Sequence, residues 1–252
     1  RPVTTPGTWV PTRLPVFPDW YAILPLWSID NPEAFMPPEP PDLASEEWAR
    51  DFNEVHSLGG QDSASRTSIQ SRIARYRITP VIMPTLRAIA DTPGRSTVQN
   101  ARMIALLYMA TDDTGIITGN AKLRYNFWRP ITAIRNADLD DNPDTLIDPD
   151  WEPYIGTPNH PEYPCAHCSW AAAVAEVLKA EVGNSPPGGV QVASRSLDYA
   201  AVQVVPTFDQ WVEEVSFSRI LGGVHYRFSN TAAEQIGRNV ARQTLGLFQP
   251  IE

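Results

Sequence analysis

The sequence predicts an all-α fold, a single helical bundle preceded by an extended proline-rich arm. From residue 45 onward, apolar residues recur with helical spacing between serine, proline and glycine signals, and strand-like alternation is nearly absent. The chain has 252 residues, 42% of them hydrophobic and 19% charged, which is typical of a globular protein with a substantial core. Because no internal repeat is visible, residues 45–252 are predicted to form one helical domain.

Residues 1–44 are predicted to form the extended arm. Eleven of the 25 prolines lie within residues 1–42, which excludes a helix and disfavours a central strand. The arm also carries more large apolar side chains than a free linker or a disordered tail needs. We therefore expect it to wrap over the bundle or over a partner subunit, and we expect a homodimer. These apolar side chains are Trp9, Trp20, Tyr21, Leu24, Leu26 and Trp27.

The first helix is expected to begin after Ser45, a typical N-cap followed by acidic residues, and to end at Gly59-Gly60. The helix within 96–115 is apolar on nearly all faces, which predicts burial. Residues 136–153 read as an acidic loop, for which a solvated loop is favoured over a calcium site because the EF-hand glycine and closing glutamate are missing. The other helices are expected within 63–79, 83–94, 169–183, 190–205, 208–223 and 231–248.

Charge and composition exclude several classes of function. A formal charge of −9 argues against a broad surface for nucleic acid or for an anionic membrane. No apolar run approaches the roughly 18 residues of a membrane span. Two cysteines are too few for a disulfide scaffold, so the compartment stays open between a secreted or periplasmic and an intracellular location.

The segment 122–130 carries two cations that are out of place in a plain core helix. Lys122 and Arg129 are seven residues apart, and we expect two turns of helix to place them on one face. They stand beside Phe127 and Trp128. Two such cations either extend to water or bind a shared anion.

A second unusual segment runs from 160 to 173. Pro161 and Pro164 hold the chain extended before a helix that is expected to begin near Cys165 and Ala166. Small residues at a helix start expose unpaired backbone amides and the positive end of the helix dipole, which suits an oxyanion. His167, in the first turn, is placed to donate a hydrogen bond or a proton to a bound group.

The third segment holds Arg219 and His225 around the pair Gly222-Gly223. Six positions of regular helix would turn the two side chains roughly 240° apart. They converge only if the glycine pair bends the chain or admits a close neighbour. Arginine binds oxyanions with a bidentate fork, and a neutral histidine is a nucleophile toward phosphorus or a metal ligand.

Together the three segments resemble the signature of the vanadium-dependent haloperoxidases and type-2 phosphatidic acid phosphatases, most closely the soluble chloroperoxidase-like branch. The pattern is Lys-x6-Arg-Pro, then Pro-Ser-Gly-His, then Ser-Arg-x5-His, and the likeness extends over residues 45–248. It stands in this chain as Lys122, Arg129-Pro130, Pro164-Cys165-Ala166-His167 and Ser218-Arg219, His225.

The resemblance implies a vanadate or phosphate site inside the bundle. Lys122, Arg129 and Arg219 would then neutralise the oxygens of the anion. His225 would be the axial ligand to vanadium or, in a phosphatase, the nucleophile, and His167 the acid–base residue. Hydrogen peroxide and a halide would be the small-molecule substrates.

The chain departs from the family pattern around this site. Cys165 replaces the serine that bonds the oxyanion, and Ala166 replaces the glycine. Gly119 stands where halide-oxidising relatives often carry a pocket tryptophan, whereas His160 fits the pattern seven residues before the acid–base histidine. We expect Gly119, His160 and Trp128 to line the pocket, and Cys165 and Ala166 to contact the oxyanion.

The departures leave three functions open: a haloperoxidase, a metal-free phosphatase with a phosphohistidine, and a family fold without vanadate that acts on an organic anion. The cysteines also leave alternatives. A Cys-x-x-Cys at a helix start resembles a redox dithiol, and a structural zinc site lacks ligands. We favour an inert buried thiol for Cys168 and a modified oxyanion contact for Cys165.

Overall fold

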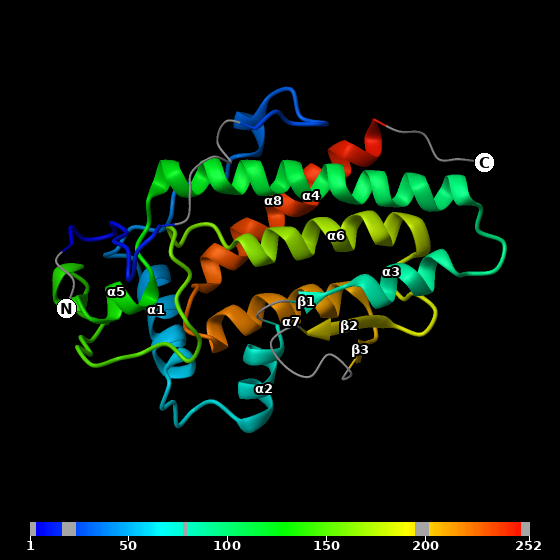
Figure 1. Cartoon of the computed structure of the whole chain (residues 1–252). Coiled ribbons are helices and arrows are strands. Elements are labelled where there is room, and N and C mark those ends of the chain that lie inside the picture. The colour runs from blue at the N-terminus through cyan, green and yellow to red at the C-terminus, as the bar shows by residue number, and fades with distance from the viewer. Residues whose placement is uncertain (1–3, 17–23, 78–79, 195–201, 248–252) are drawn as a thin grey trace.

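The computed structural model describes residues 4–16, 24–77, 80–194 and 202–247. Within them, eight α-helices form a bundle with one small sheet on its side (Figure 1), which confirms the all-α class. In chain order, the α-helices are α1 (Glu46–Gly59), α2 (Ser68–Tyr76), α3 (Met83–Ala90), α4 (Thr97–Tyr125), α5 (Pro130–Ile134), α6 (Ala166–Val182), α7 (Phe208–Leu221) and α8 (Arg227–Gly246).

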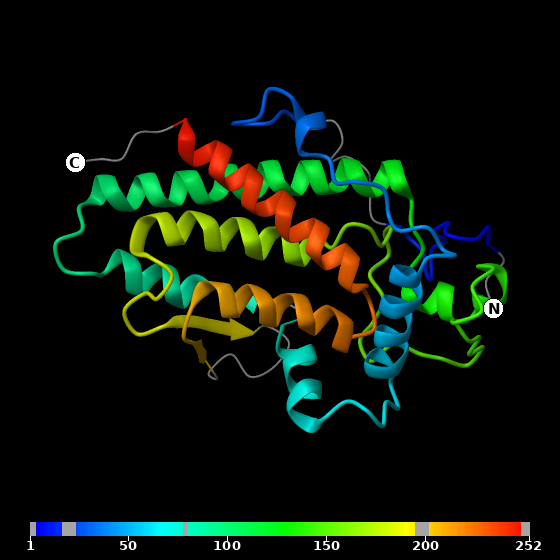
Figure 2. The ribbon, with the colours of Figure 1, turned by 180° about the vertical axis from the view of Figure 1, so that it is seen from behind.

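Helix α6 is the centre of the bundle and packs against α4, α7 and α8. Seen from behind, α8 crosses α6 and α4 obliquely (Figure 2). The crossing is close because α8 carries Gly237, where an added Cβ would lie 2.1 Å from the carbonyl oxygen of Ser169 in α6. A run of buried alanines and valines in α6 then fills the apolar core together with the fully buried Trp211 of α7.

The helix predicted over 190–205 is wrong. Its described parts are strands β2 (Val190–Ser194) and β3 (Gln203–Val205), which pair antiparallel, and β2 also pairs with β1 (Pro80–Val81). Val190 and Val192 are fully buried and alternate with the half-buried Gln191. Because β-branched side chains fit a pleated surface, this short alternation outweighed the helical spacing that extends beyond it. Residues 195–201 lie outside the described residues.

The described part of the arm lies against the bundle. It includes one short 3₁₀ helix, η2 (Pro32–Phe35). The backbone amides of Trp27 and Ser28 donate to the carboxylate of Asp113, at 2.7 and 2.8 Å, and Asp113 is fully buried in α4. The burial of an acid in α4 is thus explained by its hydrogen bonds to the backbone of the arm. Trp20 and Tyr21 lie outside the described residues, so the expectation for them stays untested.

An aromatic cluster joins α1 to the segment between α4 and α5. Trp48 stacks on Trp128 with 5.8 Å between ring centroids, and Phe127, Tyr226 and Phe228 surround the pair. The indole N–H of Trp48 donates to Asp140 at 2.9 Å, just after the 3₁₀ helix η3 (Ala137–Leu139). This buried cluster adjoins the predicted anion-binding residues, because Trp128 precedes Arg129 and Tyr226 follows His225 in the chain. No helix among the described residues has the length and apolarity to cross a bilayer.

Candidate functional site

Lys122 and Arg129 do converge, but the expected helix face is not the reason. Helix α4 ends at Tyr125, Asn126 adopts a left-handed conformation with φ of 44°, and Arg129 is the N-cap of α5. The turn at Asn126 therefore redirects the chain and brings the two side chains to the same end of the bundle, where α4 ends and α6 begins (Figure 1).

Both cations are buried, and both are held by backbone carbonyls. The ammonium group of Lys122 donates to the carbonyl oxygens of Pro161 and Glu162, at 2.9 and 2.7 Å. The guanidinium of Arg129 donates to the carbonyl oxygens of His160 and Val224, at 3.0 and 2.8 Å. Carbonyl groups satisfy hydrogen-bond donors but carry no compensating charge, so both cations remain electrostatically uncompensated by these contacts.

The glycine pair after α7 both bends the chain and admits a close neighbour, the two conditions stated for Arg219 and His225 to converge. Helix α7 ends at Leu221, and Gly223 has a φ of 75°, a conformation that favours glycine. A Cβ at Gly223 would also lie 2.3 Å from the carbonyl oxygen of Gly59, at the end of α1. The bend and the close approach together turn His225 back toward Arg129, whose Nη1 atom lies 3.1 Å from His225 Nε2.

Arg219 is the least compensated of the cations. Its side chain is 2% exposed, and its Nε and Nη2 atoms donate to the hydroxyl oxygen of Ser218, at 3.1 and 3.0 Å. Burial lowers the pKa of Arg219 to about 10, and the nearby charge of Arg129 lowers it further in the same direction. The guanidinium nevertheless keeps its charge at neutral pH.

Glu162 is the functional residue that the sequence reasoning missed. Its Oε1 atom lies 2.6 Å from His225 Nδ1 and accepts the backbone N–H of Tyr226 at 3.3 Å. Burial raises the pKa of Glu162 to about 7, against the opposing effect of Arg129 and Lys122. The sequence did contain a signal for it. Glu162 is the one acid between Pro161 and Pro164, in a segment that was already predicted to contribute residues to the site.

The electrostatics of the site are set by burial. Burial, and then the charge of Arg129, hold the pKa of Lys122 well below its usual range. Burial lowers the pKa of Arg129 to about 10 and, together with the nearby cations, that of His160 to about 2. The same causes hold the pKa of His225 well below its usual range, so both histidines are neutral at neutral pH.

Lys122, Arg129 and Arg219 outnumber the one buried carboxylate that lies among them, that of Glu162. Within the described part of the chain, no carboxylate oxygen lies within 4.0 Å of a nitrogen of these three cations. We call these three cations with Glu162 and His225 the cradle. Buried like charges are costly unless a counter-charge offsets them, so the cradle is suited to an anion.

The start of α6 lies beside the cradle and differs from the expectation for its cysteines. Cys165 is the N-cap of α6 and forms a disulfide with Cys168, so neither is the thiol that was predicted. Both sulfurs are buried, and the Cys165 sulfur accepts the backbone N–H of Cys168 at 3.3 Å. Ala166 and the half-buried His167 open the helix, and the charge of His167 acts on His160.

Gly119 and Trp128 are the other two residues that were predicted to line the pocket. Gly119 lies in α4, one turn before Lys122. Trp128 is fully buried, with its ring in the aromatic cluster beneath the cradle.

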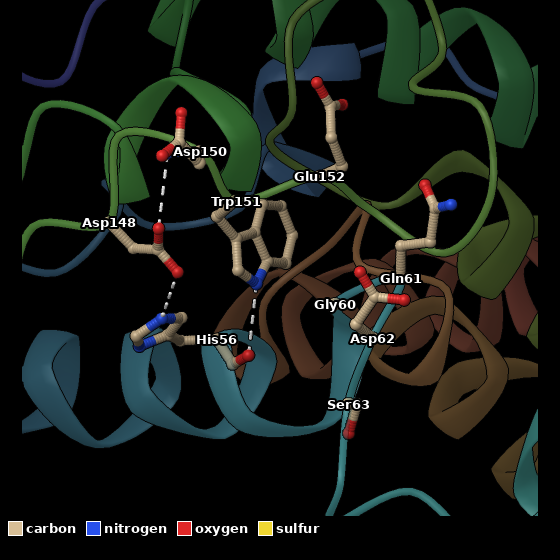
Figure 3. Close-up of a pocket in the computed structure, with 9 residues that line it drawn as sticks. All are labelled: His56, Gly60, Gln61, Asp62, Ser63, Asp148, Asp150, Trp151 and Glu152. Carbon is tan, nitrogen blue, oxygen red and sulfur yellow. Dashed lines mark hydrogen bonds and ion pairs between the residues drawn. The ribbon is translucent and has the colours of Figure 1, made fainter.

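A separate pocket of about 360 Å³ lies between the end of α1 and the acidic loop (Figure 3). His56 contacts Asp148 at 3.4 Å there, and the indole N–H of Trp151 donates to the carbonyl oxygen of His56 at 3.1 Å. Its other charged residues are acids, and the side chain of Asp148 is 41% exposed. In the described residues no group of three or more histidine, cysteine or acidic side chains is arranged to hold a metal ion. This pocket therefore lacks the buried positive charge that distinguishes the cradle.

The chain is similar to known proteins in sequence and in fold. The family description "VCPO second helical-bundle domain" matches residues 102–251. Vanadium chloroperoxidase of Curvularia inaequalis is 28% identical over 180 residues, which cover 54% of this chain and 29% of that protein.

Two solved structures share the fold. The first bacterial vanadium-dependent iodoperoxidase has a TM-score of 0.77 and 21% identity over 96% of this chain and 61% of its own. An apo-type bacterial vanadium-dependent chloroperoxidase has a TM-score of 0.74 and 16% identity, over 96% and 62%. This chain thus spans less than two thirds of each of these relatives. Because the family description covers more than half of the chain, this protein belongs to the family of the VCPO second helical-bundle domain.

Proposed function

We propose that this protein binds vanadate in the cradle and acts as a haloperoxidase-type enzyme, which uses peroxide to oxidise a halide or another small nucleophile. The observation that carries the proposal is the burial of Lys122, Arg129 and Arg219 around one carboxylate. Three buried cations with only one carboxylate among them cost folding free energy, and a bound oxyanion offsets that cost. The relatives named above carry vanadium in their descriptions, which supports the same choice of anion.

The residues present fit vanadate. Cationic donors suit its oxygens, and the imidazole of His225 offers an unprotonated Nε2 atom, because the Arg129 atom that contacts it can only donate. One family contact is altered, since the sulfur of Cys165 is engaged in the disulfide and has no proton to donate. The backbone amides at the start of α6 remain as donors for an oxygen at that side.

We assign each side chain a role that follows from its chemistry: stabilisation of charge, coordination or proton transfer. Lys122, Arg129 and Arg219 would stabilise negative charge on the oxygens of the bound anion. Arg129 must first release Nε2 of His225, so binding exchanges this hydrogen bond for one to an anion oxygen. His225 would hold the central atom, and His167, half-buried at the rim, would move protons to and from peroxide. Vanadate, when bound, supplies the activation of peroxide toward the halide.

A metal-free phosphatase is the second candidate. The unprotonated Nε2 atom of His225 is also the nucleophile that a phosphohistidine mechanism needs. In that case His167 would protonate the leaving oxygen, and the three cations would stabilise negative charge on the phosphate oxygens.

The test is vanadate binding to the purified protein by calorimetry in phosphate-free buffer, with His225→Ala as the control. We expect binding that depends on His225, followed by bromination of an acceptor when peroxide and bromide are added. Vanadate binding without halogenation, but with phosphate release from an aryl phosphate, would select the phosphatase. If neither anion binds, both candidates are rejected in favour of a pocket for an organic anion.

A further inference from the structure

The contact between Glu162 and His225 determines which nitrogen of the imidazole carries the proton. Arg129 has only donors, so the Nε2 atom that it contacts at 3.1 Å must be the acceptor. A neutral imidazole has one N–H, which must therefore be on Nδ1. That N–H points to Oε1 of Glu162 at 2.6 Å, a distance typical of a strong hydrogen bond to a charged acceptor.

Apart from one long contact, the backbone N–H of Tyr226 at 3.3 Å, the side chain of Glu162 makes no hydrogen bond to the backbone of the fold among the described residues. The backbone of Glu162 is the part that contacts the fold, because its N–H donates to the carbonyl oxygen of Phe127 at 2.8 Å and its carbonyl accepts from Lys122. The carboxylate is fully buried, and its second oxygen, Oε2, has no partner with hydrogen-bond geometry among the described residues. The hydroxyl of Ser229 lies close enough to lower the pKa of the carboxyl but does not complete a hydrogen bond to it. Buried polar atoms in a purely structural role are nearly always paired, so a half-satisfied carboxylate indicates a functional reason for its position.

We propose that Glu162 is a positioning residue that keeps the Nδ1 proton of His225 in place, aims the Nε2 lone pair into the cradle, and strengthens it as an electron donor to the central atom of a bound oxyanion. The proposal rests on the proposed function, because it assigns a role within the same site. A carboxylate behind a ligating imidazole raises the basicity of that ligand, and loss of such a partner commonly weakens metal binding by about 10–100-fold.

The role makes opposite predictions for two anions of similar shape. Vanadate accepts a nitrogen ligand readily, so its affinity depends on the donor strength of Nε2. Inorganic phosphate bound without reaction needs only the cations. Removing the negative charge of Glu162 therefore weakens the bond to vanadate, while it makes the cradle more positive and favours phosphate.

The experiment compares vanadate and inorganic phosphate binding to the wild-type protein and to Glu162→Gln by calorimetry at pH 8. We expect the vanadate affinity of the variant to fall about tenfold or more, and its phosphate affinity to be unchanged or higher. The matched control is Asp51→Asn. Asp51 is also buried and accepts a backbone N–H, that of Phe228 at 2.7 Å, and it does not touch His225. The control is expected to leave the ratio of the two affinities unchanged.

An equal loss of both affinities in Glu162→Gln would assign Glu162 a structural role and overturn the proposal. So would vanadate affinity equal to that of the wild type.

A second measurement does not depend on any bound anion. In the ¹⁵N NMR spectrum of the apoprotein, the signals of His225 are assigned by their loss in His225→Gln. We expect the proton on Nδ1 in the wild type and in both Glu162 variants, because Arg129 still requires Nε2 as an acceptor. The ¹H signal of that Nδ1–H should lie far downfield in the wild type, as in a strong hydrogen bond to a carboxylate, and should move upfield in Glu162→Ala. A proton on Nε2 in the wild type, or an unchanged Nδ1 proton shift in Glu162→Ala, rejects the positioning role. If the wild type binds neither anion, the proposed function fails and this spectrum alone decides on Glu162.

Discussion

The two ends of α6 lie in surroundings of opposite chemistry. Toward its C-terminus, Val177 and Leu178 pack into an apolar core with Trp211. At its N-terminus the neighbours are the cations of the cradle, Glu162 and His225. Apolar burial stabilises the fold by about 25 cal/mol per Å², whereas buried cations without a counter-charge oppose folding. We therefore expect the apolar end to stabilise the fold and the cradle to oppose folding, a cost that the proposed anion would offset.

The largest expected effect is on the apolar end. Trp211→Ala removes a fully buried ring that packs edge-on against Trp170 at 6.1 Å between centroids. We expect the free energy of unfolding to fall by about 3–5 kcal/mol, measured by urea denaturation. Trp27→Ala is the control, because that side chain is 66% exposed, and its effect should stay within about 0.5 kcal/mol. A loss below about 1 kcal/mol for Trp211→Ala would contradict the contrast between the two ends.

At the cradle, removing a charge should have the opposite effect on stability: the free energy of unfolding should rise. Arg219→Met replaces a buried guanidinium that has a hydroxyl but no carboxylate within reach among the described residues. We expect the apoprotein to gain about 1–3 kcal/mol in urea denaturation. Its affinity for vanadate should fall about 100-fold or more, because one of three cations is lost.

The matched control for this variant is Arg242→Met, at a guanidinium whose side chain is 59% exposed. Neither quantity should change by more than the error of measurement there. A destabilised Arg219→Met protein would mean that the cation serves the fold, and the proposed division between the two ends would be wrong.

A third expected effect, which is absent at neutral pH and grows only toward acid, is a pH dependence of the stability. The pKa of His160 is lowered to about 2 in the fold, by burial first and then by the charges of Lys122, Arg129 and His167, from about 6.5 in the unfolded chain. Between these values the unfolded state binds a proton that the native state does not, so stability falls as pH falls from about 6.5. The slope for one histidine is about 1.4 kcal/mol per pH unit.

His160→Phe should therefore make the acid slope shallower by about that amount between pH 6 and 4, measured as the free energy of unfolding at each pH. Above pH 7 its slope should match that of the wild type. An unchanged acid slope would show that His160 is protonated in the native state at mildly acidic pH.

Much of the helix order could be predicted from the sequence, and the exceptions are informative. The N-cap at Ser45 and the end of α1 at Gly59 depend on residues a few positions apart, and both were predicted correctly. The strands β2 and β3 were missed because the alternation in β2 covers only residues 190–192, which is too short to outweigh helical spacing until its partner strands are known. The disulfide of Cys165 was likewise hidden, because spacing alone does not separate a buried thiol pair from a bonded one.

The sequence by itself determined the fold class and the positions of the predicted anion-binding residues. Hydrophobic periodicity, helix caps and motif spacing depend only on residues that are close together in the chain. Only the tertiary structure decided how those residues meet. Lys122 and Arg129 converge through a turn at Asn126 rather than along one helix. Glu162 and His225 are 63 residues apart and form their hydrogen bond only after α4, α6 and α7 have packed. A charge balance of buried groups depends on the whole surroundings of each group, and no local pattern in the chain records it.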